Sequence, residues 1–492
     1  MDSMLCDELL QEIISRLVSE SSASPAPSSS ASSVSLVSKR WLRLYRTSRT
    51  SLSLRFAPDN STIQSLLSLL SNYPFLSSLP LLFSSDPTLT ITNSTNTAFN
   101  DHLLFIVSTS CSKLKHLRFL AGPISHSSLL SLSTTSALLT SLTIVLSRPL
   151  FFNWVAYFSS LKELSIYVSD FDGAGDEFYS NSQSGLYLNQ ETDAELGLES
   201  LYLSGIKRDD SGLGWLWRSC KKLKKLQLKN CEGIGDGGSF LSFIRCLNVL
   251  QELELRTCRS IVDGVLIRLA ENCESLNSLL VYDGGSREGF LHFINNCRCN
   301  LQKLDLRLPL DLNNDHLLAI AVNFRGLSTL RLRSCCLVTG EGLKALGIAM
   351  SSGLLKELAL INCDVVERES GLLATLGQHL KQLGKLDLSH NESLLDKEFI
   401  SMLVSCNNLV ELRLRGCKGL TSLAILSRFK SCKRLENVDI IHCCGIEAEA
   451  IEFFVLNSPR LRRMQVEESK VSDVARTWAS HKLIEVVASF MN

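Results

Sequence analysis

The sequence lacks long apolar runs and has no excess of charge of either sign. Its 492 residues hold 50 Lys and Arg against 50 Asp and Glu. No stretch approaches the roughly 18 apolar residues of a membrane-spanning helix. The basic start of a secretory signal peptide is also missing, because Asp2, Asp7 and Glu8 stand there. We therefore expect an intracellular protein, nuclear or cytoplasmic, that binds neither membrane nor nucleic acid through bulk charge.

The sequence also has little that is typical of catalysis or metal binding. Residues 233–238 are glycine-rich but lack the Lys-Ser/Thr pair of a phosphate-binding loop. Cys297 and Cys299 have no second ligand pair at zinc spacing. No local spacing brings a nucleophile beside a base. We expect a protein that is not an enzyme, without a metal site or a required cofactor.

What the sequence does have is leucine at a fixed spacing. Residues 409–417 read L-x-x-L-x-L-x-x-C, and Leu412 and Leu414 lie two apart, so on a strand they point to one face. From Leu198 to Leu461 this frame recurs on average every 26 residues, 263 residues over ten intervals. A helical bundle would show leucines at 3.6-residue spacing without such a register. The frames begin at Leu198, Leu223, Leu250, Leu276, Leu301, Leu327, Leu355, Leu383, Leu409, Leu435 and Leu461, with weaker copies at Leu114, Leu139 and Leu161.

A single unit of this kind cannot bury its leucines alone and needs a copy on either side. The period lies in the range of leucine-rich repeats. The sequence therefore predicts an α/β leucine-rich-repeat solenoid, a horseshoe with a parallel β-ribbon on its concave side and helices on its convex side.

Eleven of the 17 cysteines follow the same register. Six stand at the last position of the strand frame, and five lie three residues before a leading leucine. At such positions a thiol packs as a small hydrophobe in a buried bend, so we expect reduced cysteines. The two sets are Cys231, Cys258, Cys335, Cys363, Cys417 and Cys443, and Cys111, Cys220, Cys273, Cys406 and Cys432.

The first fifty residues have a different pattern, with apolar residues at helical spacing over residues 7–18 and again over residues 34–45. Two short helices cannot bury this much apolar surface, and a partner helix would complete them. We therefore expect a helical module at residues 1–50, with a Ser/Pro-rich loop at residues 20–33. A repeat region follows at residues 51–470, with degenerate early repeats to about residue 113 and an insertion at about residues 169–190. Residues 471–492 are expected to form a C-terminal capping helix.

The insertion is acidic, rich in Gly and Ser, and carries aromatic residues. Insertions in a solenoid map to loops on one face and often contribute to binding. A disordered surface segment is the other interpretation, and composition does not choose between them.

Residues 5–17 and 33–41 resemble an F-box. The second segment is especially similar to F-box proteins of the plant type with cysteine-containing leucine-rich repeats, including the auxin, jasmonate and strigolactone receptor group. The apolar residues at matching positions either bind the Skp adaptor or build the small helical core, and the sequence does not separate these roles. They are Leu5, Leu9, Leu10, Ile13, Leu17, Leu36, Val37 and Trp41.

The resemblance implies a substrate-recognition subunit of a Skp–cullin–F-box ubiquitin ligase, non-catalytic and monomeric within the complex. Its partners would be the Skp adaptor, through it a cullin, and an unknown protein to be ubiquitinated. Two alternatives stay open. One is a hormone-like small-molecule receptor of the same type of complex, and the other is a repeat scaffold outside any ligase.

Arginine is concentrated at strand positions that flank the buried leucines and so fall on the concave face. One interpretation is an anionic partner, either an acidic degron (the segment that marks a protein for ubiquitination) or an inositol polyphosphate of the kind that the hormone-receptor relatives bind. The other is a ladder of cross-strand ion pairs with Glu254, Asp305, Asp387 and Glu411. Tyr282 with Leu280 and Ile361 adds an apolar patch. The candidate binding residues are Tyr282, Arg256, Arg307, Arg331, Arg333, Arg413 and Arg415.

Overall fold

The computed structural model describes nine stretches of the chain: residues 6–21, 36–56, 60–83, 97–169, 194–235, 238–308, 312–351, 354–428 and 432–489. Leu5, most of the Ser/Pro-rich loop and all but residue 169 of the insertion lie outside them. Leu17 lies in a described helix, but its side chain is not described.

The structure has a 17-stranded sheet, and strands that follow one another along the chain are neighbours in it from β1 to β6 and from β7 to β17. The pairings are parallel, as the repeat pattern predicts. The strands are β1 Leu54–Phe56, β2 Ser78–Phe83, β3 His116–Pro123, β4 Ser141–Leu146, β5 Glu163–Val168, β6 Ser200–Ser204, β7 Lys225–Lys229, β8 Glu252–Arg256, β9 Ser278–Tyr282, β10 Lys303–Arg307, β11 Thr329–Arg333, β12 Glu357–Ile361, β13 Lys385–Asp387, β14 Glu411–Arg413, β15 Asn437–Asp439, β16 Arg463–Glu467 and β17 Glu485–Ser489.

Helices alternate with these strands. The α-helices are α1 Asp7–Ser21, α3 Lys39–Ser48, α4 Asn60–Leu70, α5 Thr97–Ser110, α6 His126–Thr135, α8 Leu213–Ser219, α9 Ser239–Leu247, α10 Val262–Asn272, α11 Arg287–Asn296, α12 Asn314–Asn323, α13 Gly340–Ala349, α14 Asp364–Arg368, α15 Leu372–His379, α16 Asp396–Leu403, α17 Ser422–Arg428, α18 Ala448–Asn457 and α19 Asp473–His481. Short 3₁₀ turns, η1 Asn153–Tyr157 and η4 Glu468–Lys470, complete the set. In the part of the chain that the structure describes, no helix is long and apolar enough to cross a bilayer.

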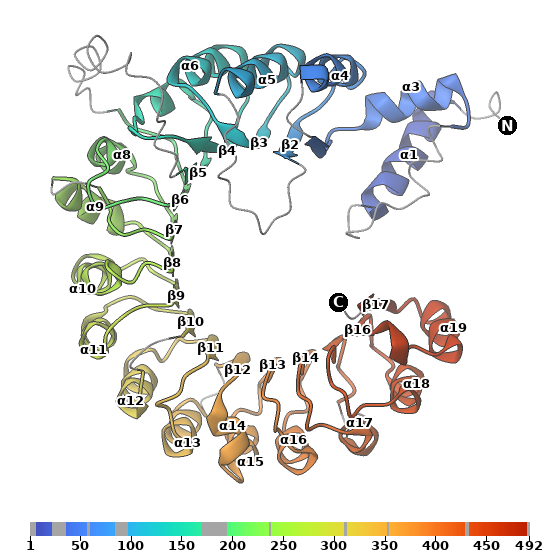
Figure 1. Ribbon diagram of the computed structural model, residues 1–492. Coiled ribbons are helices and arrows are strands. Elements are labelled where there is room, and N and C mark those ends of the chain that lie inside the picture. Colours follow the sequence, from blue (N-terminus) through green and yellow to red (C-terminus); the bar gives the residue numbers. More distant parts are fainter. Residues whose placement is uncertain are drawn as a thin grey trace. The chain divides into compact units, whose positions relative to one another are not determined.

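The chain forms two compact units, Met1–Lys224 with Gly233–Cys246, and Lys225–Glu232 with Leu247–Asn492. Within the first unit, α4, α5 and α6 lie on one side of β2, β3 and β4 (Figure 1). Within the second, α10 to α18 lie on one side of β8 to β16 (Figure 1). We call the other side of the strands the helix-distal face.

The predicted leucine frames are confirmed. Each strand from β6 to β16 begins two residues after the first leucine of its frame, and the three weaker frames lead into β3, β4 and β5 in the same way. Pleating explains the pattern. In β11, Leu330 and Leu332 point into the core and are buried, whereas Arg331 and Arg333 point to the helix-distal face. Burial of each such leucine stabilises the fold by about 1.5–3 kcal/mol.

Cysteines link successive repeats. The thiols of Cys417 and Cys443 donate to the carbonyl oxygens of Leu388 and Leu414 in the preceding repeat, at 3.1 and 3.0 Å. In the repeat of β13, Asn391 takes this position and donates to the carbonyl oxygen of Leu360 at 2.8 Å. Burial raises the pKa of the Cys443 thiol to about 12. All 17 cysteines are free thiols.

A left-handed residue follows many of the strands. Asn230, Thr257, Asp283, Leu308, Ser334, Asn362, His390, Gly416 and His442 all have positive φ, and they recur with the repeat period. In this conformation the backbone amide of the left-handed residue donates a hydrogen bond to the carbonyl oxygen of the last residue of the next strand. Thr257 N, for example, donates to Tyr282 O at 2.8 Å. Only one of these nine positions is glycine, so the others accept a conformation that costs an L-residue about 1–2 kcal/mol.

Three expectations need correction. The repeats before residue 113 are less degenerate than expected, because Leu76, Leu79 and Leu81 form a complete frame that leads into β2, and all three are buried. The second helix begins at Lys39 instead of residue 34, because the Ser38 side chain caps it by accepting from Trp41 N at 3.2 Å. The C-terminal segment is a helix only over α19, and β17 follows and pairs with β16.

Candidate interaction surfaces

The N-terminal helices α1 and α3 pack on each other around a small core. Leu10, Ile14 and Leu44 are buried, and Trp41 and Tyr45 pack against them half-buried. Leu10 and Ile14 are four residues apart and so lie on the same side of α1. This pair therefore has an apolar interior of its own.

An ionic contact joins the two helices at one end. The Asp7 carboxylate, in the first turn of α1, lies 2.6 Å from Arg40 and 3.3 Å from Arg43 of α3. A carboxylate at this position also faces the positive end of the α1 dipole. The ion pairs of Asp7 thus hold the first turn of α1 against α3.

Four apolar side chains of the predicted adaptor-binding set are exposed. Leu9, Ile13, Leu36 and Val37 are 54%, 40%, 84% and 60% exposed. Leu9 and Ile13 lie on α1 one residue before the buried Leu10 and Ile14, and Leu36 and Val37 immediately precede the Ser38 cap. The structure thus divides the predicted adaptor-binding set into two groups. Leu10 belongs to the core of the helical pair, whereas these four side chains face solvent.

The second candidate surface is the helix-distal face of the repeats. Strand pairing places Arg256, Tyr282, Arg307 and Arg333 in one row across β8 to β11. A neighbouring row runs through Glu254, Leu280, Asp305, Arg331, Ala359, Asp387, Arg413 and Asp439.

Most arginines of this face form ion pairs. Arg256, Arg307 and Arg413 each pair with the carboxylate two residues earlier on the same strand, at 2.8, 2.7 and 2.5 Å. The partners are Glu254, Asp305 and Glu411. These three ion pairs run along single strands, in addition to the cross-strand pairs that the sequence predicts.

Other pairs run between strands. Arg331 pairs with Glu357, Arg415 lies 3.0 Å from Asp439, and Arg463 lies 3.7 Å from Glu485. Two lysines do the same, since Lys225 lies 3.2 Å from Glu252 and Lys385 lies 3.1 Å from Glu411. Asp387 forms no ion pair with any described residue, and its carboxylate accepts from Ser389 N at 3.0 Å instead. Among the predicted candidate arginines, Arg333 is the one whose guanidinium has no ion-pair or hydrogen-bond partner among the residues that the structure describes.

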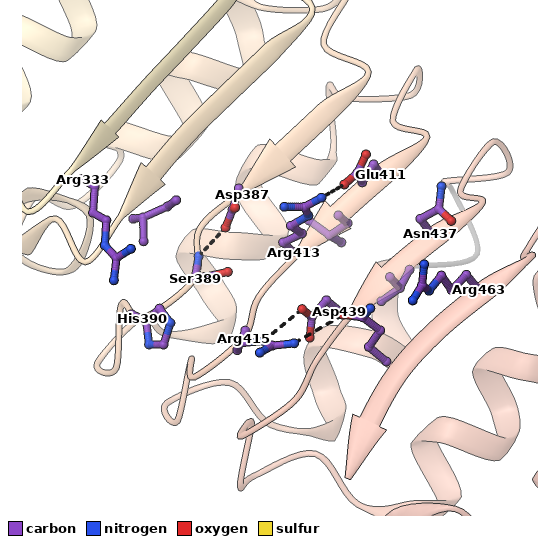
Figure 2. Close-up of a pocket in the computed structure, with 14 residues that line it drawn as sticks. Arg333, Asp387, Ser389, His390, Glu411, Arg413, Arg415, Asn437, Asp439 and Arg463 are labelled. Atoms are coloured by element: carbon purple, nitrogen blue, oxygen red, sulfur yellow. Dashed lines mark hydrogen bonds and ion pairs between the residues drawn. The ribbon is translucent and has the colours of Figure 1, made fainter. Parts of the chain in front are cut away.

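A pocket of about 550 Å³ lies on this face at β11–β16. Three of the seven predicted residues line it, Arg333, Arg413 and Arg415. Arg256, Tyr282, Arg307 and Arg331 lie outside it, on or beside the strands that lead up to it. Figure 2 shows Arg333 and His390 at one end of the view and Arg463 at the other.

Charge in the pocket is layered. The side chains of Asp387, Glu411 and Asp439 are 8%, 16% and 13% exposed, whereas Arg413, Arg415 and Arg463 are 41–46% exposed. The carboxylates thus form the floor and the guanidiniums the accessible layer. Burial alone would raise the pKa of Glu411, but the Lys385 hydrogen bond and the Arg413 charge hold it below its ordinary value.

Several lining residues were missed from the sequence. Gln465 continues the row of Asp439, so extending that row to β16 finds it. Asn437 and Arg463 lie in a third row, in register with Glu411, which the two predicted rows do not include. His390 follows β13 in the left-handed turn with φ 62°, a conformation that no local motif indicates.

Comparison with known proteins gives distant similarities. No protein-family model matches the chain. It is 29% identical over 162 residues to F-box/LRR-repeat protein 4 of Bos taurus, covering 32% of this chain and 26% of that protein. It is 24% identical over 284 residues to EEED8.10 of Caenorhabditis elegans, which carries RNA-binding protein in its name, covering 55% of this chain and 36% of that one. The chain thus spans about a quarter to a third of the length of these relatives.

Among solved structures, yeast Rad7, crystallised as a complex with Elc1, aligns with a TM-score of 0.47 and 16% identity over 87% of this chain and 93% of that one. The repeat register and the parallel sheet carry the fold assignment. The chain is a leucine-rich-repeat protein with distant similarity to F-box/LRR-repeat protein 4.

Proposed function

We propose that this chain is the substrate-recognition subunit of a Skp–cullin–F-box ubiquitin ligase. The observation that carries the proposal is the helical pair of α1 and α3, which has its own core and still leaves Leu9, Ile13, Leu36 and Val37 in solvent. A helical cap that served only to cover the end of the repeats would have no need of a second apolar surface. The F-box resemblance of residues 5–17 and 33–41 supports the same reading, as does the local similarity to F-box/LRR-repeat protein 4.

The exposed side chains supply a driving force for docking. Burying one leucine-sized side chain is worth about 1.5–3 kcal/mol, so four of them can form the centre of an interface. Leu10 and Ile14, which are buried in one cluster with Leu44 of α3, hold α1 in place and so keep Leu9 and Ile13 in position before the adaptor binds. The proposed occupant is the Skp adaptor, and the cullin joins through it.

The chain itself would hold the target protein in place and would take no part in the chemical reaction. Binding a target on the repeats places its lysines near the ubiquitin carrier that the cullin brings, which raises their effective concentration. The bond to ubiquitin is then formed by other subunits.

Co-purification with a Skp adaptor tests the proposal. Leu9→Asp with Leu36→Asp should abolish association, because both side chains are exposed and their replacement leaves the Leu10 core intact. The matched control is Leu423→Asp, an exposed leucine on α17 of the repeats, which should bind the adaptor like the unaltered chain.

Absence of association for the unaltered chain would overturn the proposal. So would equal loss with the Leu423 control, since that result indicates general damage. Elc1, the partner in the Rad7 structure, serves as a second bait, and capture of Elc1 with no capture of Skp would replace the Skp assignment.

Membership of the plant hormone-receptor group is a narrower proposal. It predicts that an inositol phosphate or a plant hormone raises the melting temperature of the purified chain by ligand linkage. A thermal-shift series with these compounds checks it, and a flat series leaves protein recognition as the function.

A further inference from the structure

We infer that the pocket at β11–β16 binds an extended acidic peptide segment, with carboxylates spaced about four and about five residues apart. The inference rests on the proposed function, because the segment would belong to the protein that is to be ubiquitinated. The inferred ligand gives the chemical class of that target segment, and the lining arginines are the residues that would bind it.

The layering of charge determines which sign of ligand fits. The acids of the floor are mostly covered, and Glu411 and Asp439 are already paired with Arg413 and Arg415. A basic peptide would therefore have to displace these guanidiniums to reach a carboxylate. An acidic peptide meets the exposed guanidiniums directly, and each of them keeps N–H donors that its floor partner does not use.

Arg333 supplies an anchor at one end. It is exposed, lines the pocket, and no carboxylate of the described chain lies within ion-pair distance of it. The other candidate arginines give up part of their charge to a neighbouring acid, so Arg333 offers the strongest uncompensated positive charge in the pocket. His390 lies on the same side of the pocket (Figure 2).

Strand spacing sets the length of the ligand. Arg333 on β11 and Arg415, just past the end of β14, are three strands apart, about 14 Å. Arg463 on β16 lies two strands beyond Arg415 and four residues back along the strand direction, about 16 Å away. An extended peptide advances about 3.3 Å per residue, so carboxylates about four and then about five residues apart would reach all three arginines at once.

The space between the arginines adds selectivity. Ile361 lies beside Arg333 in the same row and is half-buried, so it offers an apolar contact between the first two acidic positions. The side-chain amides of Asn437 and Gln465 line the same pocket and can hydrogen-bond a peptide backbone.

An inositol polyphosphate fits the same surface less well. Its phosphates concentrate their charge within a few ångströms, whereas Arg333, Arg415 and Arg463 are spread across and along the strands. Arg415 and Arg463 are also each paired with an acid. The test below treats that class of ligand as a separate outcome.

The probe is a fluorescein-labelled synthetic peptide of about ten residues. It carries three glutamates at the spacing above, one leucine between the first two, and serine or glycine elsewhere. Fluorescence anisotropy with the purified full-length chain measures binding without any ligase subunit, so a failed adaptor assay and a failed peptide assay remain distinguishable.

We expect saturable binding that weakens with added salt, and a rise in Kd of about tenfold or more for Arg333→Glu and for Arg463→Ala. Arg256→Ala is the matched control, because Arg256 lies in the row of Arg333 but outside the pocket, and its Kd should stay within about twofold of the unaltered value. The glutamine version of the peptide should not bind.

Four results would overturn the inference: no saturation with the glutamate peptide, equal binding of the glutamine peptide, equal loss with Arg256→Ala, or tight binding of inositol hexakisphosphate with none of the peptide. A peptide with the same three glutamates placed side by side tests the spacing. It should bind at least severalfold more weakly, and equal affinity would reduce the pocket to a non-specific anion surface.

Discussion

The helical pair of α1 and α3 and the strands of the second unit use apolar side chains in opposite ways. In the strands nearly every frame leucine is buried, and the helix-distal face carries paired charges. Among the side chains of the helical pair that the structure describes, three apolar ones are fully buried, whereas Leu9 and Leu36 are exposed by 54% and 84%. Stability is thus concentrated in the repeats, and apolar surface available for binding is concentrated in the helices.

The difference indicates two modes of recognition within one chain. A partner of the helical pair would gain free energy by burying apolar surface, which depends little on salt. A ligand of the β11–β16 pocket would gain it from charge, which salt screens. The following predictions test this contrast, beginning with the largest expected effect.

Removing one buried leucine from the repeats should cost far more than removing one exposed leucine from the helices. Leu412 is fully buried in β14, and Leu412→Ala should lower the free energy of unfolding by about 3 kcal/mol, through lost burial and the cavity left behind. Leu9→Ala should change it by less than about 0.5 kcal/mol. Chemical denaturation followed by circular dichroism measures both, and equal costs would remove the distinction between the two regions.

Asp7→Asn should weaken the helical pair without affecting the repeats. Asp7 contacts Arg40 and Arg43, so we expect a local loss of about 1 kcal/mol from the lost ion pairs and from the dipole of α1. Faster hydrogen exchange at α1 amides, with unchanged exchange in β11, is the readout. Glu12→Gln, which removes only an exposed pair within α1, is the control and should have the smaller effect.

Thr257→Gly should stabilise the repeats. Thr257 has φ 56° and no recorded side-chain hydrogen bond in the described structure, and glycine adopts this conformation without the steric cost. A gain of about 0.5–1 kcal/mol is expected after the entropic cost of glycine. Thr329→Gly, in the extended strand β11, should instead lose a similar amount. A lower melting temperature for Thr257→Gly would contradict the role of the turn.

The smallest effect concerns the floor of the pocket. Because the folded-state pKa of Glu411 is lower than its ordinary value, this carboxylate stabilises the fold above about pH 4.5, and the contribution disappears as the pH falls through the folded-state pKa. Glu411→Gln should therefore reduce the loss of stability between pH 7 and pH 4 by a few tenths of a kcal/mol. Glu163→Gln, at an exposed position of β5, should leave that loss unchanged.

The sequence predicts the strands well because each of them requires the same buried spacing. Leucines two residues apart must face one side of a strand, and a neighbour one period away must cover them, so the register of β6 to β16 follows from the leucine positions alone. The early strand β2 was misjudged because the interval of 38 residues between Leu76 and Leu114 hides its frame.

The site was less predictable, for a geometric reason. On a strand, an arginine lies at similar distances from a carboxylate two residues away and from one on the next strand, so the choice of Glu254 by Arg256 depends on side-chain rotamers. Likewise Leu9 and Leu10 both belong to a broad apolar stripe on α1, and only the position of α3 decides which of them is buried.

The thiol arrangement has a practical consequence. Of the 17 cysteines, Cys6, Cys336 and Cys444 are exposed, and most of the others are enclosed between repeats. A maleimide reagent should therefore attach first at these three positions under native conditions. With Cys336→Ser, one dye at the beginning of α1 and another beside the last repeats would make the chain a reporter of its own movements when an adaptor or a peptide binds.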